Sequence, residues 1–350
     1  MKRPLIGIGV LSLIATFALI AGGDDDKGKP APPQQNASQK NSGPQPNVSI
    51  TPRAKVGAPE TITDRRSDIR VDTDLVLIYV SVTDPIGRYV TGLDKENFKL
   101  TEEYNGKKVD QDITQFSNED APMSVGLVFD TSGSMGPKLE RSRQAVGQFL
   151  KTANPEDEFF LVQFNDRPEM VVPFTPDTEE LQNRLLFTQS RGRTALLDGV
   201  YMAMNQMKKA RNPRKAILII SDGGDNSSRY TESEVKTQVR ESDVQIYAIG
   251  IFESMAGRNR TPEEAGGPQL LNEIAEQTGG RFFSADSLND LPDIAAKIGL
   301  ELRNQYVLGY SPKNKERDGK FRRVHVRLVK TTGMPQLKPT HRPGYYAPAQ

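Results

Sequence analysis

The sequence contains no cysteine, and its two histidines, His325 and His341, both lie near the C-terminus. Without cysteine the chain has no disulfide, no thiolate metal site, no cysteine nucleophile and no lipid-modified cysteine. With only two histidines, a metal or catalytic site built from several histidines is also excluded. The sequence also lacks a phosphate-binding loop of the form Gly-x-x-x-x-Gly-Lys. These absences favour a binding protein over an enzyme, and we expect neither catalytic residues nor an organic cofactor.

The chain shows little excess of charge of either sign. Its net charge is +1 although 26% of its 350 residues are charged. This balance indicates neither a nucleic-acid partner nor an acidic tail. With 36% hydrophobic residues, the chain is long enough for one medium α/β domain and a smaller second domain.

The N-terminus has the composition of a targeting segment. Lys2 and Arg3 precede an uncharged apolar run from residue 5 to residue 21, which ends in small residues. Residues 1–23 are therefore predicted to be a signal peptide or an uncleaved membrane anchor. Either alternative places the remaining chain outside the cytoplasm, in the periplasm, on the cell surface or secreted. Residues 24–70 are rich in Pro, Gln, Asn and Ser, which predicts a disordered linker.

Two short segments with β patterns flank the middle of the chain. In residues 71–120 apolar side chains alternate from residue 76 to residue 82, and Asn105-Gly106 predicts a hairpin between strands at 98–101 and 109–116. In residues 305–350, strands are expected at 306–310 and 321–329, with Arg323, His325 and Arg327 on the solvated face of the second. Each segment is too small to be stable alone. We therefore expect them to pair into one split antiparallel β domain.

Residues 121–304 alternate between strand and helix patterns. Strands are expected at 124–129, 159–164, 170–174, 216–220, 244–251 and 281–284, and helices at 138–152, 178–187, 195–209, 232–241, 270–277 and 288–303. This alternation predicts a doubly wound, mainly parallel α/β sheet, Rossmann-like in type, inserted into the split β domain. Residues 253–267 are expected to form a polar loop, whose role is left open.

Oxygen-bearing side chains follow two of the buried strands. Asp130, Ser132 and Ser134 come directly after the apolar run 125–129, and Asp222 ends the strand at 216–220. Thr194 begins a helix and is expected at the same sheet edge, where open α/β sheets bind ligands. Hard oxygen donors suit Mg²⁺, with Mn²⁺ or Ca²⁺ as alternatives. The first motif alone is equally consistent with a turn that caps a helix, and Asp225, nearby, is expected to be a solvated loop residue.

Three motifs carry a resemblance to a known family. Asp-Thr-Ser-Gly-Ser-Met, Gly-Arg-Thr-Ala-Leu and Ile-Ile-Ser-Asp-Gly, in this order, resemble the metal-ion-dependent adhesion site (MIDAS) of von Willebrand factor A (VWA) domains over residues 123–304. The flanking β segments resemble those of bacterial VWA-related envelope proteins, most clearly at Gly-Arg-Tyr-Val-Thr-Gly-Leu. The resemblance implies a metal site with these ligands: Asp130, Ser132, Ser134, Thr194 and Asp222. Gly-Pro-Lys after Met135 replaces the paired acids of the accessory site in integrins, so one metal is implied.

The family resemblance implies that one coordination position stays open for a carboxylate of a partner. We therefore expect an extracytoplasmic adhesion or assembly module that binds a protein ligand through Asp or Glu, with no nucleic-acid partner and no membrane contact beyond the N-terminal segment. One alternative is an envelope scaffold with a structural role, and another is a metal-dependent hydrolase. The partner and the oligomeric state are left open.

Overall fold

The computed structural model describes residues 75–349 except 119, 253–261 and 330–335. The described residues belong to one compact unit, Ile69–Gln350. The predicted targeting segment 1–23, the predicted linker 24–70 and most of the loop 253–267 lie outside the described residues. Within the described ranges, no helix is long and apolar enough to cross a membrane.

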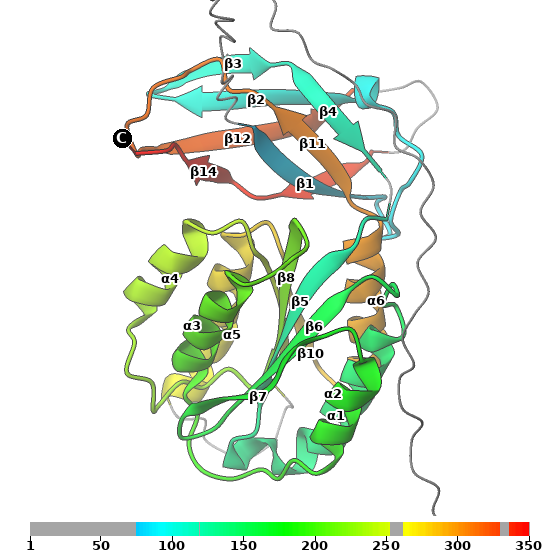
Figure 1. The fold of residues 1–350 in the computed structure, drawn as a ribbon, viewed down its shortest axis with the longest axis vertical. Coiled ribbons are helices and arrows are strands. Elements are labelled where there is room, and N and C mark those ends of the chain that lie inside the picture. Colours follow the sequence, from blue (N-terminus) through cyan, green and yellow to red (C-terminus); the bar gives the residue numbers. More distant parts are fainter. Residues whose placement is uncertain (1–74, 119, 253–261, 330–335, 350) are drawn as a thin grey trace, which may run out of the picture. The chain divides into compact units, whose positions relative to one another are not determined.

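A six-stranded sheet forms the centre of the α/β part, in the order β10-β9-β8-β5-β6-β7 (Figure 1). Its strands are parallel except that β7 runs antiparallel to β6. The strands are β5 (Met123–Asp130), β6 (Glu158–Phe164), β7 (Pro168–Thr175), β8 (Arg214–Ser221), β9 (Gln245–Ile251) and β10 (Phe282–Ala285).

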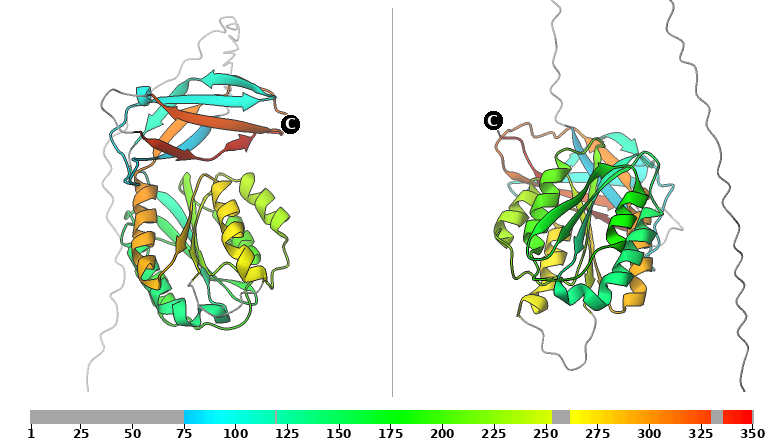
Figure 2. Two further views of the ribbon diagram at one scale, coloured as in Figure 1. Left: turned by 180° about the vertical axis from the view of Figure 1, so that it is seen from behind. Right: turned by 60° about the horizontal axis from the view of Figure 1, so that its bottom comes forward.

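Helices cover both faces of this sheet, as Figure 2 shows from two further sides. They are α1 (Leu139–Leu150), α2 (Thr178–Leu186), α3 (Leu196–Met207), α4 (Glu232–Arg240), α5 (Pro262–Glu276) and α6 (Leu291–Arg303), with short 3-10 helices η1 (Lys95–Asn97), η2 (Gly133–Lys138) and η3 (Leu288–Asp290). Side chains of α1, α2 and α6 pack on one face, and those of α3, α4 and α5 pack on the other.

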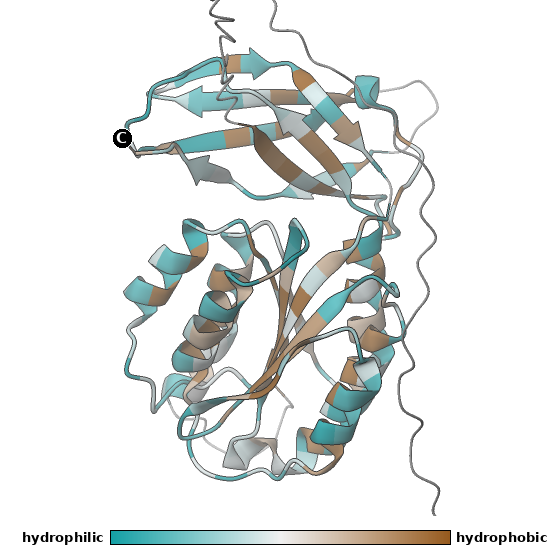
Figure 3. Cartoon of the chain, viewed as in Figure 1, coloured by the Kyte–Doolittle hydropathy of each residue, from teal (hydrophilic) through white to brown (hydrophobic). Residues whose placement is uncertain are grey.

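Strand β5 is buried along its whole length because both faces of the sheet are covered. Figure 3 shows the strands of this sheet as the most hydrophobic part of the α/β layers. Gly126 in the middle of β5 leaves room for a neighbouring aromatic ring, since a Cβ atom there would lie 2.2 Å from Cζ of Phe160. Close packing of this kind fixes the register of β5, and with it the position of the residues that follow the strand.

The remaining strands form two four-stranded sheets, in the orders β13-β1-β11-β4 and β14-β12-β2-β3. Their strands are β1 (Val76–Thr83), β2 (Phe98–Tyr104), β3 (Lys107–Gln111), β4 (Ile113–Ser117), β11 (Tyr306–Tyr310), β12 (Phe321–Leu328), β13 (Lys338–His341) and β14 (Gly344–Tyr346). All pairings in them are antiparallel. Strands from before and after the α/β part alternate in the first sheet, and in the second sheet β12 from the end of the chain pairs with β2 from its beginning. The predicted fold class is confirmed: a mainly parallel α/β sheet inserted into a split antiparallel β part.

Two segments differ from the sequence-based expectation. The single strand expected at 109–116 is two strands, because the chain leaves β2 after Gln111 and pairs with β11 from Ile113 onward. The helix expected at 270–277 is also longer, since α5 begins at Pro262 and includes Pro268. The predicted hairpin turn is confirmed, because Asn105 and Gly106 have φ angles of +48° and +74°, as a type I′ turn requires.

Candidate metal centre

The predicted acidic residues lie at one edge of the six-stranded sheet. Strands β5 and β8 are parallel neighbours, with Phe129 opposite Ile220, so Asp130 and Asp222 both stand at the carboxyl end of this pair. The hydroxyl of Ser221 donates to Oδ2 of Asp130 at 2.6 Å and ties the two strand ends together. This edge is the lower end of the sheet in Figure 1.

Asp130 is fully buried. Besides the bond from Ser221, its Oδ1 accepts the backbone N–H of Ser132 at 2.8 Å. The pKa of Asp130 is raised to about 7, mainly by burial and then by the neighbouring Asp222 carboxylate. Hydrogen bonds from Ser132 and Ser221 act in the opposite direction and lower the pKa. The pocket around Asp130 therefore holds more negative charge than its surroundings stabilise, which a cation would correct.

The two serines of the first motif lie side by side. The hydroxyl oxygens of Ser132 and Ser134 are 3.1 Å apart. Ser132 is buried and Ser134 is exposed, so the pair extends from the protein interior to its surface. The helix expected from residue 138 begins as the 3-10 helix η2, and α1 follows only at Leu139. Ser132 is the N-cap of η2, but its side chain makes no capping bond to the helix, so its hydroxyl faces Ser134 and Asp130 instead.

The loop that contains Thr194 is bonded directly to the first motif. The backbone N–H of Gly133 donates to the carbonyl of Gly192 at 3.0 Å, and the N–H of Arg191 donates to the carbonyl of Thr131 at 2.8 Å. Gly192 has φ of +77°, and a Cβ atom there would lie 2.4 Å from Oδ2 of Asp166. Glycine is therefore needed at this position for both its backbone angle and its lack of a side chain.

A residue that sequence reasoning missed positions Thr194. Oδ1 of Asn226 accepts the backbone N–H of Thr194 at 3.0 Å, and the N–H of Asn226 donates back to the carbonyl of Thr194 at 3.0 Å. Asp225 is not the solvated residue expected: it is half-buried, accepts the hydroxyl of Ser228 at 2.6 Å, and its pKa is raised by burial. The loop after Asp222 thus holds the Thr194 loop in place.

Lys138 is the second residue that sequence reasoning missed. Its Nζ lies 2.8 Å from Oδ2 of Asp222, and the two side chains are only 11% and 8% exposed. The ammonium group compensates one of the two carboxylates of the site. One hint of this role was present in the sequence: Lys138 belongs to the Gly-Pro-Lys segment that stands where integrins have paired acidic residues.

The donor set fits a hard divalent cation. Among the residues that the structure describes, no three His, Cys, Asp or Glu side chains are grouped so that they could hold a metal. The predicted set instead combines two carboxylates with three hydroxyls, all oxygen donors of the kind that Mg²⁺ takes together with water. The burial of Asp130 and the nearness of Asp222, which together raise the pKa of Asp130, are conditions that a bound cation would offset.

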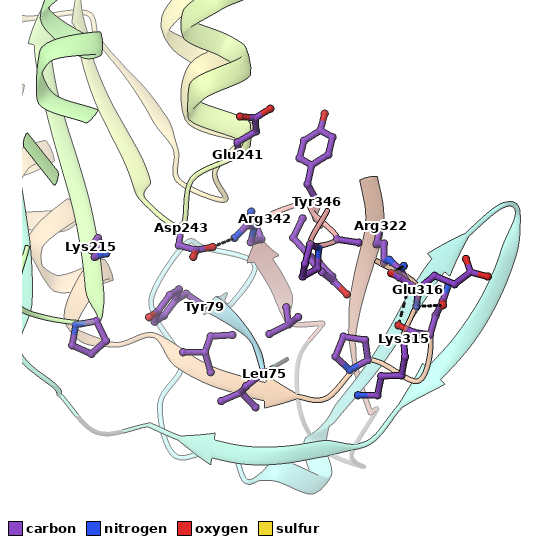
Figure 4. Close-up of a pocket in the computed structure, with 18 residues that line it drawn as sticks. Leu75, Tyr79, Lys215, Glu241, Asp243, Lys315, Glu316, Arg322, Arg342 and Tyr346 are labelled. Atoms are coloured by element: carbon purple, nitrogen blue, oxygen red, sulfur yellow. Dashed lines mark hydrogen bonds and ion pairs between the residues drawn. The ribbon is translucent and has the colours of Figure 1, made fainter. Parts of the chain in front are cut away.

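A cavity elsewhere in the described chain has a different character. It is lined by Leu75, Tyr79 and Arg322 from the β part and by Lys215 and Asp243 from the α/β part (Figure 4). Its lining includes the ion pair between Arg342 and Asp243 at 2.9 Å. None of the five predicted metal ligands lines this cavity.

Parts of the chain are similar in sequence to known proteins. An uncharacterized protein of Borreliella burgdorferi is 27% identical over 187 residues, which are 47% of this chain and 54% of that protein. Inter-alpha-trypsin inhibitor heavy chain H4 of Bos taurus is 26% identical over 134 residues, or 35% of this chain and 15% of the heavy chain. The chain thus spans about half the length of the first relative and a small part of the second.

A solved structure, described as von Willebrand factor type A from Catenulispora acidiphila, aligns with a TM-score of 0.46 and 12% identity, covering 79% of this chain and 74% of that chain. A family model described as the von Willebrand factor type A domain matches residues 125–224. This range begins in β5 and includes all five predicted ligands. The chain therefore contains a von Willebrand factor type A domain.

Proposed function

We propose that this chain is an extracytoplasmic, metal-dependent protein-binding module for adhesion or assembly. VWA domains are commonly involved in metal-dependent protein interaction. The proposal is supported by the hydrogen bonds that join the three segments carrying the proposed ligands at one edge of the sheet. The proposed ligands of a divalent cation, Mg²⁺ or alternatively Mn²⁺ or Ca²⁺, are Asp130, Ser132, Ser134, Thr194 and Asp222.

Neutral hydroxyls supply most of the proposed ligands. When bound, the cation would supply an electrophilic centre with a position open for a carboxylate of the partner. Ser221 and Ser132 orient the carboxylate of Asp130 through the bonds at 2.6 and 2.8 Å. The two positive charges of a bound cation would balance the carboxylates of Asp130 and Asp222, so the loaded site would carry little excess negative charge to repel an incoming acidic side chain.

The proposed domain boundaries follow the sheets. Residues 121–304 would form the binding domain, while 71–120 and 305–350 would form one β domain that carries it. The segment 1–23 would direct or anchor the protein outside the cytoplasm, in the envelope of a bacterial cell. An envelope scaffold differs from this proposal only in its partner.

Metal titration of the full chain tests the proposal. Isothermal titration calorimetry with Mg²⁺ should show one binding site in the wild type and none in Asp130→Asn, which removes the charge but preserves the shape of the side chain. Asp286→Ala, which removes an exposed carboxylate outside the site, should bind as the wild type does. Equal metal binding by wild type and Asp130→Asn would contradict the proposal.

Capture of a partner from a bacterial envelope extract tests the proposed protein binding. A partner should be retained with Mg²⁺ and lost with EDTA or with Asp130→Asn. Retention that depends neither on the metal nor on Asp130 would favour the scaffold. Metal-dependent turnover of phosphoesters or peptides that Asp130→Asn abolishes would favour the hydrolase.

A further inference from the structure

Three exposed arginines lie in two connections at the edge of the sheet that carries the proposed metal ligands: Arg167, Arg191 and Arg193. Arg167 lies in the connection between β6 and β7, and the other two lie in the connection between α2 and α3. The backbone of both connections is fixed, because the N–H of Arg191 donates to the carbonyl of Thr131 at 2.8 Å and the N–H of Ala195 donates to the carbonyl of Asn165 at 2.8 Å. We call these three residues the rim arginines.

The rim arginines carry positive charge that the described part of the chain does not pair. Arg229, in the next loop, contacts Asp198 at 3.4 Å, whereas no carboxylate within the described ranges forms an ion pair with a rim arginine. Asp166 is close in sequence, but its Oδ1 accepts the backbone N–H of Arg193 at 2.8 Å. Several unpaired charges of one sign around a site attract a ligand of the opposite sign.

An exposed apolar surface lies at the same edge. Phe187 and Leu186, at the end of α2, are 85% and 60% exposed. The next residue, Thr188, is held at the end of β6 because its hydroxyl accepts Nε2 of Gln163 at 2.7 Å and its carbonyl accepts the guanidinium of Arg143. Phe187 is therefore presented to solvent by backbone anchored beside it, which suits a contact with a partner.

We propose that this edge receives an acidic segment of a partner protein. The carboxylate bound by the metal would be flanked by further carboxylates that face the rim arginines, and by an apolar side chain that packs on Phe187. This inference rests on the proposed metal-dependent binding and specifies the composition of the partner. A protein segment is favoured over a phosphate polymer because such a polymer has no apolar side chain to cover Leu186 and Phe187.

Two labelled peptides with blocked ends test the charge requirement. Glu-Asp-Leu-Asp-Glu carries four carboxylates, and Gln-Asn-Leu-Asp-Gln keeps one of them along with the leucine. By fluorescence anisotropy with the full chain and Mg²⁺, the first peptide should bind about 3- to 125-fold more tightly, because each of its three additional carboxylates can form an exposed ion pair that contributes a factor of about 1.5 to 5. The difference should shrink between about 10 mM and about 150 mM salt, as the screening length falls from about 30 Å to about 8 Å.

Matched double variants locate the effect. Arg191→Gln with Arg193→Gln should remove most of the preference for the acidic peptide and leave the metal-dependent binding of the other peptide intact. Arg323→Gln with Arg327→Gln, which removes two exposed charges from β12, should keep the preference. Phe187→Ser should weaken the binding of both peptides about equally, since both contain the leucine.

The outcomes separate this inference from the function on which it rests. Equal affinity of the wild type for both peptides, or an unchanged preference in the Arg191 and Arg193 double variant, would overturn the role of the rim arginines. Tighter binding of polyphosphate than of the acidic peptide would overturn the choice of a protein segment. Peptide binding that neither EDTA nor Asp130→Asn changes would reject the metal bridge itself.

Discussion

The contact between Lys138 and Asp222 leads us to predict how the stability of the protein depends on bound metal. We expect Lys138→Met, which keeps the apolar stem and removes the charge, to destabilise the metal-free protein much more than the metal-loaded protein. Nζ of Lys138 is 2.8 Å from Oδ2 of Asp222, and both side chains are nearly buried. In the variant without metal, no cation faces the carboxylates of Asp222 and Asp130.

The size of the effect follows from the burial of the pair. Removing one partner of a buried ion pair costs about 3–5 kcal/mol, and we take about 3 kcal/mol because the site lies at the edge of the sheet. For a domain of this size, that corresponds to a Tm lower by about 6–12 °C. A bound divalent cation would face Asp222 in place of the ammonium group, so most of the loss should be recovered with excess Mg²⁺.

The assay is thermal unfolding of the full chain followed by circular dichroism, in EDTA and in excess Mg²⁺. Lys209→Met, at an exposed position after α3, serves as the control and should change Tm little in either buffer. The affinity for Mg²⁺, measured by calorimetry, should increase in Lys138→Met. An equal loss of Tm in both buffers, or no loss in EDTA, would refute the assigned competition between Lys138 and the cation.

Three further predictions concern other parts of the structure. Gly192→Ala should weaken Mg²⁺ binding in calorimetry about 10-fold, because a Cβ atom would lie 2.4 Å from Oδ2 of Asp166 and displace the Thr194 loop. Glu301→Leu should lower the unfolding free energy in urea by about 1–3 kcal/mol, because the buried hydroxyl of Tyr247, which donates to Glu301 at 3.2 Å, would lose its acceptor, and Glu301→Gln should lose less. Burial lowers the pKa of His341 in the folded protein, so the unfolded state takes up a proton at a higher pH than the folded state does. The stability that His341 contributes above about pH 6.5 should therefore be lost as the pH falls. His341→Gln should lose less stability over the same pH range.

Each of these predictions has a matched control. Gly87→Ala tests a positive φ angle of +81° without a clash, and it should leave metal binding unchanged. His325→Gln removes the other histidine and should keep the acid sensitivity assigned to His341, whose Nδ1 donates to a carbonyl and whose Nε2 accepts the N–H of Val326. Identical acid profiles for wild type and His341→Gln would show that another group controls the loss.

The order of elements and the edge shared by Asp130 and Asp222 were predictable because they depend on local patterns. Buried strands, turn residues and helix periodicity are visible in a short window of sequence. The pairing of β5 with β8, which are separated by β6 and β7 in sequence, does not follow from these local patterns and comes from the structure.

Buried polar partners were not predictable in this way. Arg322 follows the exposed Phe321 and falls on the core side of β12, where the alternation of apolar residues gave no signal for it. It is buried because Glu102 lies 3.5 Å away and because Glu102 also accepts the hydroxyls of Tyr310 and Tyr345, each at 3.0 Å. Lys138 and Asn226 belong to the same class: their positions depend on contacts between distant segments.

The interleaved β part has a consequence for biosynthesis. Strand β1 is made early, yet its partners β11 and β13 come from the end of the chain: Ser81 accepts a hydrogen bond from Gln305, 224 residues later. At about 5–20 residues per second, the intervening chain takes about 11–45 s to synthesise. Throughout that interval β1 has neither neighbour and presents two open edges to other chains. A protein that is exported while it is made would therefore depend on a chaperone, or on rapid transfer of its C-terminus, to complete this domain.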